Sequence, residues 1–179
     1  KVCPYTLKEK KKMLQEAIHL TIPDFDEEEI NKNIYTVEEI KVINLIALTY
    51  SDAGQNRKAI DIYYQLLKYM KGHIMSLSEA NRLIVLICYN CSRSLYFEKR
   101  YEESIEIANM GVKTSIEERY SGCFGGLFSI LGHAYYAEEK FEDSKQCFYQ
   151  SYYMYTIIRD EEYIQLAAKN LKDFFDIEV

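Results

Sequence analysis

The chain has 179 residues, 48% of them hydrophobic and 28% charged, so it can bury a core, which excludes a wholly disordered protein. Its 2 prolines and 7 glycines are too few for the many turns of a β-sandwich or barrel, and they favour long helices. The 22 basic and 28 acidic residues give a net charge of -6, which argues against strong DNA binding by this chain alone.

The cysteine content and the hydropathy indicate the compartment. Five cysteines are an odd number in a chain too long to be a small disulfide scaffold. No apolar stretch is long enough to span a membrane, and the first residues lack the apolar segment of a signal peptide. We therefore expect a cytoplasmic protein without membrane contact. Because Lys1 is not an initiator methionine and helical patterning follows at once, we also expect the chain to be a piece of a longer protein.

Helix starts are marked by capping boxes, in which a Ser, Thr or Asp side chain and a Glu three residues later satisfy free backbone N–H groups. Such pairs are Thr6 with Glu9, Asp26 with Glu29, Thr36 with Glu39, and Ser76 with Glu79. Helix ends are expected near Pro23, Gly54 and Gly72. Apolar spacing then predicts helices over 6–20, 36–53, 57–71, 77–97, 101–116, 121–138, 141–158 and 160–175. The short connections between them predict antiparallel neighbours.

A motif recurs three times along these helices with the same internal offsets. Its small residues allow two helix axes to approach closely, while larger residues fill the groove between them. They are Ala47, Ser92 and Gly132 on the first helix of each pair, and Ala59, Ser104 and Ser144 on the second. The sequence thus predicts an all-α superhelix of antiparallel helix pairs.

The third copy, Leu131-Gly132-His133-Ala134-Tyr135, resembles the tetratricopeptide repeat (TPR), which implies a right-handed superhelix forming one domain over 1–179. The repeats are placed at about 36–71, 77–116 and 121–158, with a partial repeat at 6–20 and a capping helix at 160–175.

The segments 17–25, 38–47 and 59–67 resemble the C-terminal TPR region of Firmicute transcription regulators with an Xre-type helix-turn-helix, similar to the peptide-sensing Rgg/RNPP class. The resemblance implies that the TPR array forms a homodimer and senses a short peptide or protein partner, as in quorum sensing. It also implies that DNA is bound only through a helix-turn-helix domain that is absent from this chain.

The first helix of each TPR pair lines the concave face, so residues one past its core positions are expected to line a ligand groove. These candidates are Asn44, Leu48, Tyr89, Asn90, Arg93, Tyr96, Ser129, His133 and Tyr136. Amides and tyrosines suit an extended peptide, since Asn can bond both backbone N–H and C=O. The resemblance implies a groove role for Asn44 and Asn90 in particular. The alternatives are a solvated amide at Asn44, an ion pair at Arg93, and a core-edge histidine at His133.

The terminal helix carries large apolar residues that are expected either to cap the array or to form a dimer contact. They are Tyr163, Leu171, Phe174 and Phe175.

Other functions find little support in the sequence. No catalytic motif is present, and the three histidines are spread along the predicted array, so we expect no enzyme and no cofactor. Cys88 and Cys91 fall on core positions without a second ligand pair, which argues against zinc. The glycine-rich segment 121–126 lacks the Lys of a phosphate loop. The remaining alternative is a free-standing TPR adaptor or inhibitor that binds a signalling protein without binding DNA.

Overall fold

The computed structural model describes residues 4–73 and 78–179, and within these residues it contains α-helices, one short 3-10 helix and no strand. The elements are α1 (Leu7–Thr21), η1 (Ile30–Lys32), α2 (Val37–Asp52), α3 (Asn56–Gly72), α4 (Ser78–Phe97), α5 (Tyr101–Glu117), α6 (Phe124–Ala137), α7 (Phe141–Ile158) and α8 (Glu161–Phe175). The all-α prediction is confirmed, and the helix bounds agree with the predicted ones to within three residues.

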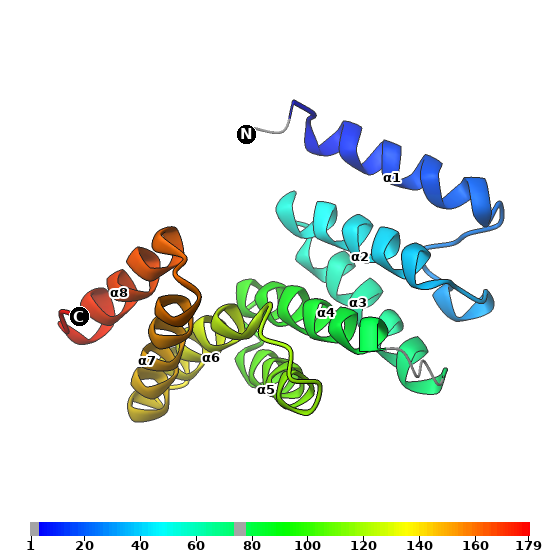
Figure 1. The fold of residues 1–179 in the computed structure, drawn as a ribbon. Helices are drawn as coiled ribbons and strands as arrows, with labels where there is room; N and C mark the ends of the chain where they lie inside the picture. The colour runs from blue at the N-terminus through cyan, green and yellow to red at the C-terminus, as the bar shows by residue number, and fades with distance from the viewer. Residues whose placement is uncertain (1–3, 74–77) are drawn as a thin grey trace.

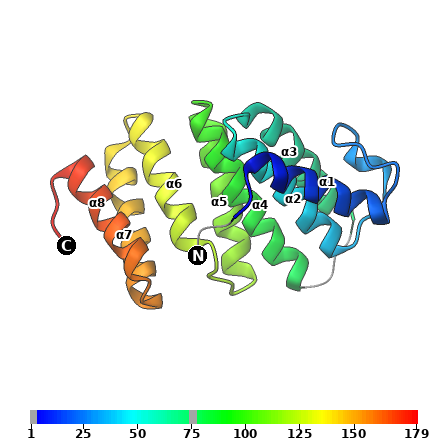
Figure 2. The same cartoon turned by 90° about the horizontal axis from the view of Figure 1, so that it is seen from above.

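The helices form a curved row of antiparallel pairs (Figures 1 and 2). Helices α2 and α3, α4 and α5, and α6 and α7 pack as pairs, and α2 also contacts α4 as α4 contacts α6. Helices α2, α4 and α6 therefore follow one another on the inner side, with α3, α5 and α7 on the outer side, and α8 packs on α7. In Figure 1 the end helices α1 and α8 rise on either side of α4 and α6. The predicted superhelix of helix pairs is confirmed.

The predicted small residues lie where the two helices of a pair approach each other. The Ser104 hydroxyl donates to the Ser92 carbonyl at 2.8 Å, and the Ser144 hydroxyl donates to the Gly132 carbonyl at 2.7 Å. Both serines are fully buried. A hydroxyl that bonds the partner helix holds the axes together and leaves no unsatisfied buried group.

The turn inside each pair uses one backbone conformation. Gly54, Lys99 and Glu139 have positive φ values of 75°, 60° and 58°. In the second pair the Arg100 N–H then bonds the Leu95 carbonyl at 3.0 Å, and the equivalent bonds recur in the other two pairs. This is the left-handed closure of a helix end, for which glycine is the usual residue. Of these three turns, the sequence predicted only the one at Gly54.

Replacing Lys99 by glycine should therefore raise the free energy of unfolding by about 0.5 to 1 kcal/mol, because a left-handed conformation is strained for residues with a Cβ atom. The measurement is urea denaturation followed by helical circular dichroism. The control is Lys113→Gly, an exposed position inside α5, which should lower stability by about 1 kcal/mol. Equal effects at the two positions would contradict the strain argument.

The N-terminal helix is attached by a small core and a polar cluster. Ile18 is the buried residue of α1. Glu27, in the connection to α2, accepts from Gln15 Nε2 and from the Tyr50 hydroxyl, each at 2.6 Å, and lies 3.6 Å from Lys58 Nζ. One carboxylate thus joins α1, α2 and α3.

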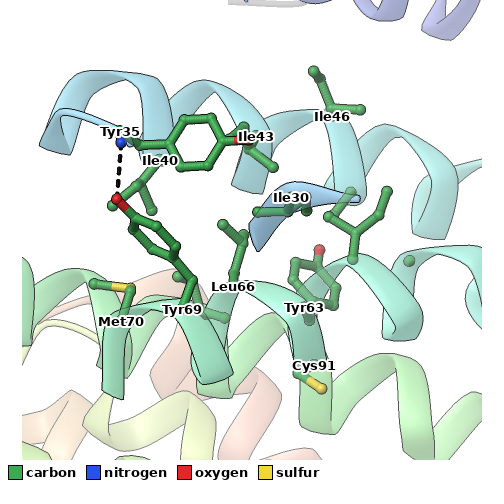
Figure 3. Packing of buried hydrophobic residues seen from close by; sticks show 14 of the residues in the cluster. Ile30, Tyr35, Ile40, Ile43, Ile46, Tyr63, Leu66, Tyr69, Met70 and Cys91 are labelled. Atoms are coloured by element: carbon green, nitrogen blue, oxygen red, sulfur yellow. Dashed lines mark hydrogen bonds between the residues drawn. The ribbon is translucent and has the colours of Figure 1, made fainter. Parts of the chain in front are cut away.

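The core next to this cluster includes side chains of α3. There the Tyr69 hydroxyl of α3 accepts from the Tyr35 N–H, in the connection before α2, at 2.8 Å (Figure 3). Ile30 and Tyr35 carry the connection between α1 and α2 into this core.

Two of the predicted capping boxes are present, at Thr6 with Glu9 and at Thr36 with Glu39. The box at Asp26 was wrong: its carboxylate accepts from the Glu28 N–H at 2.8 Å in a turn, and no α-helix begins there. Ser76 lies outside the described residues.

Candidate ligand-binding face

The inner face is formed by side chains of α2, α4, α6 and α8. On α4, Tyr89, Arg93 and Tyr96 are spaced four and three residues apart, so they share one side of the helix, and each is half-buried. Most of the sequence-predicted groove residues lie on this face. Their contacts show which of them remain available to a ligand.

Aromatic contacts join α4 to α6. The Tyr89 ring lies against the backbone of Gly126, where an added Cβ atom would be 2.6 Å from the ring. The Tyr96 and His133 rings have centroids 5.7 Å apart. Glycine at the start of α6 thus permits a tyrosine of α4 to cover it.

Similar contacts join α6 to α8. Ser129 Oγ lies 3.5 Å from Asn170 Nδ2, and the Phe174 ring packs on Tyr136 at 4.7 Å and on His133 at 5.2 Å. Helix α8 therefore continues the inner row.

Between α2 and α4 the contacts are polar. Arg93 pairs with Asp52 at 3.1 Å and covers the Phe97 ring at 5.7 Å. Asn90 Nδ2 donates to Asn44 Oδ1 at 3.2 Å, and the two residues are only 5% and 2% exposed. The structure thus places both asparagines in the seam between the helices, because α4 packs over that side of α2. Their predicted contact with a ligand stays a prediction.

An apolar pocket of about 350 Å³ opens on the inner face between α1 and α2. It is lined by Tyr5, Leu7, Lys10, Met13, Leu14, Leu45, Leu48, Thr49 and Asp52. Leu48 is the one predicted groove residue that lines it. Sequence reasoning missed the others, because the core pattern of α1 does not show which partner covers its second apolar side. The available signal was Leu45, an apolar residue outside the core positions of α2, which the structure leaves 43% exposed.

His133 sits among aromatic rings from three helices, and no partner for its Nδ1 is found among the described residues. Burial lowers the pKa of His133 below its usual 6.5, because the charged imidazolium is poorly solvated there. The folded protein therefore favours the neutral imidazole of His133.

This shift predicts a pH dependence of stability. Since the unfolded chain binds the His133 proton more readily, stability should fall as the pH drops below about 6.5, the usual pKa of histidine. The urea midpoint of the parent should fall with the pH in this range. The urea midpoint of His133→Phe should fall less steeply. The exposed His19→Gln variant is the control and should keep the slope. An unchanged slope in His133→Phe would assign the effect elsewhere.

Cys88 and Cys91 are buried in the core and carry no exposed thiol. Burial raises the pKa of the Cys88 thiol to about 12 and raises that of Cys91 as well. No cluster of metal-binding side chains occurs among residues 4–73 and 78–179. Over the same residues, no helix is both long and apolar enough to cross a membrane.

The predicted dimer residues of α8 contact their own chain. Leu171 is fully buried, and Phe174 and Phe175 are half-buried against Tyr136. Tyr163 stacks on Tyr155 at 4.9 Å and keeps an exposed edge. This packing is that of a cap on the array, and a dimer contact by these residues stays a prediction.

Comparison with known proteins gives a family and a fold. Residues 11–176 match the family model described as the RNPP family C-terminal domain. No curated protein matches the chain by sequence.

Two solved structures of Bacillus thuringiensis PlcR superpose with a TM-score of 0.67 at 20% identity. In its apo form the match covers 94% of this chain and 66% of PlcR; in its complex with the peptide PapR7 and DNA it covers 91% and 62%. BtubC (BKLC) from P. vanneervenii matches with a TM-score of 0.72 at 14% identity, over 96% of this chain and 66% of its own. The chain thus spans slightly less than two thirds of each of these proteins.

Proposed function

Because the chain belongs to the family of RNPP C-terminal domains, we propose that it is the ligand-sensing part of a transcription regulator and that a short peptide binds its inner face. The family match over residues 11–176 carries the proposal. The shared fold with PlcR, which has been solved with a peptide and DNA, supports it.

The side chains of the inner face suit such a ligand. Tyr89, Tyr96 and Tyr136 supply rigid apolar surface with a polar tip, and the pocket between α1 and α2 offers room for an apolar side chain. Arg93 already holds the Asp52 carboxylate, and a carboxylate of a peptide could replace it. An extended peptide across α2, α4 and α6 would use all three features.

Dimerisation and DNA contact belong to the same proposal. In this proposal the chain forms a homodimer and a separate basic domain contacts DNA, which the net charge of -6 on this chain supports. A peptide that favours one curvature of the row of helices would shift the population of dimer arrangements. Each pair contacts only its neighbours, so small rotations at each seam add along the array.

The test is isothermal titration of the chain with pooled synthetic short peptides, followed by deconvolution of any binding pool. Arg93→Met and Tyr96→Ala should each weaken binding by about tenfold or more, since each removes an interaction at the centre of the face. Tyr153→Ala, an exposed tyrosine on the outer helix α7, is the control and should bind as the parent does. Binding that survives both inner variants but is lost in the outer one would contradict the proposed site.

A further inference from the structure

A second apolar groove lies on the outer side of the array, between α3 and α5, and has a volume of about 400 Å³. Leu67 of α3, Ile84 of α4, and Ile107 and Met110 of α5 line it, and all four are partly exposed. Leu67, Ile84 and Ile107 pack on the core with part of each side chain open to the groove, and Met110 is 38% exposed beside them.

The spacing of the lining residues fits a helix. On α3 the groove runs from Tyr64 through Leu67 to Lys71, and on α5 from Ile107 through Met110 to Thr114. Each edge therefore repeats at three and four residues and extends over seven, which is about 10 Å along a helix. Two such parallel ridges leave a furrow that the ridge of a third helix can fill. An occupant of two helical turns has the same length.

The charge of the groove indicates which helix fits. Lys68 and Lys71 are exposed along the α3 edge of the groove. Neither pairs with a carboxylate of the described residues, whereas Lys41 pairs with Glu79 and Lys58 with Glu27. Near Tyr64, Glu103 accepts from the tyrosine hydroxyl at 2.9 Å and is held by Arg100 at 2.5 Å. The charge of Glu103 is thus balanced by Arg100, and Lys68 and Lys71 have no carboxylate partner in the part of the chain that the structure describes.

We infer that this outer groove is a docking site for an amphipathic helix of a partner protein, with apolar residues at i, i+3 and i+7 and acidic residues on the flank that faces Lys68 and Lys71. The site lies on α3 and α5, away from the inner face, so it does not depend on the proposed peptide ligand. It gives the array a surface through which it can act on a second protein.

The probe is a fluorescent synthetic helix with leucines at these positions and glutamates on one flank, and its partner probe carries lysines instead of glutamates. Anisotropy should show binding of the acidic probe, and the NMR methyl signals of Ile84, Ile107 and Met110 should shift on binding. The double variant Lys68→Glu, Lys71→Glu should weaken the acidic probe about tenfold and favour the basic one.

Two further variants complete the experiment. Met110→Glu places a charge inside the groove and should abolish binding of the acidic probe, whereas Lys169→Glu, an exposed site on α8, should leave it unchanged. Equal binding of both probes, or methyl shifts confined to the inner face, would overturn the inference. So would a change of oligomeric state in Met110→Glu by sedimentation, because the groove would then be a contact between copies of this chain.

Discussion

Replacing Gly132 by valine should lower the free energy of unfolding by about 3 kcal/mol or more. Gly132 lies where α6 crosses α7, and a Cβ atom added there would be 2.6 Å from two carbon atoms of the Phe148 ring. Phe148 is fully buried and is itself packed on Phe174, so the ring has little room to move. The Ser144 hydroxyl bond to the Gly132 carbonyl would stretch as the helices separate.

The measurement is urea denaturation with circular dichroism, together with hydrogen exchange to locate the loss in α6, α7 and α8. Gly72→Ala at the end of α3 is the control, because nothing lies within 4 Å of a Cβ atom there. That variant should be neutral or slightly stabilising. A neutral Gly132→Val would mean that the pair of helices is packed more loosely than its geometry implies.

Removing one of the two buried asparagines should cost about 2 to 3 kcal/mol of stability, with or without a ligand. In Asn90→Ala the Asn44 amide loses its 3.2 Å partner while it remains buried between α2 and α4. Asn44→Ala should behave in the same way. The double variant should lose about 1 kcal/mol less stability than the two single variants lose together, because both single variants remove the same shared interaction.

Urea denaturation of the parent, both single variants and the double variant gives this coupling. Asn109→Ala, an exposed asparagine on α5, is the matched control and should change stability little. Additive single effects would show that the amides do not depend on each other. Because these variants weaken the fold itself, Arg93 and Tyr96 are better positions at which to test peptide binding.

The helices were predictable because their apolar spacing persists over four or five turns and their ends carry local signals. Thr36 and Gly54 bracket α2 in this way. The start of α6 was expected at 121, yet the helix begins at Phe124, since the Phe124 N–H bonds the Ser121 carbonyl in a preceding turn. Lys99 and Glu139 could not be identified as helix stops, because neither residue type favours positive φ.

The site was less predictable than the fold. A rule of spacing identifies the side of a helix on which a residue lies, but it does not show which neighbouring helix covers that side. Asn44 and Asn90 satisfied the rule, and each is covered by the helix that bears the other. Phe174 was expected to be a cap or a dimer contact, and only the packed structure shows that its ring lies against Tyr136 of α6 and Phe148 of α7. Such choices depend on packing between segments that are distant in sequence.

The turns within the helix pairs bear on how the array can change length. Three residues separate Asp52 from Asn56, and the same number separate α4 from α5 and α6 from α7. One inserted residue would rotate the second helix by about 100° and, in the second and third pairs, carry its buried serine away from the partner carbonyl. The connections between pairs, at 73–77 and 118–123, differ in length. The helix pair is therefore the unit that can be duplicated, deleted or grafted, with splice points between pairs rather than within them.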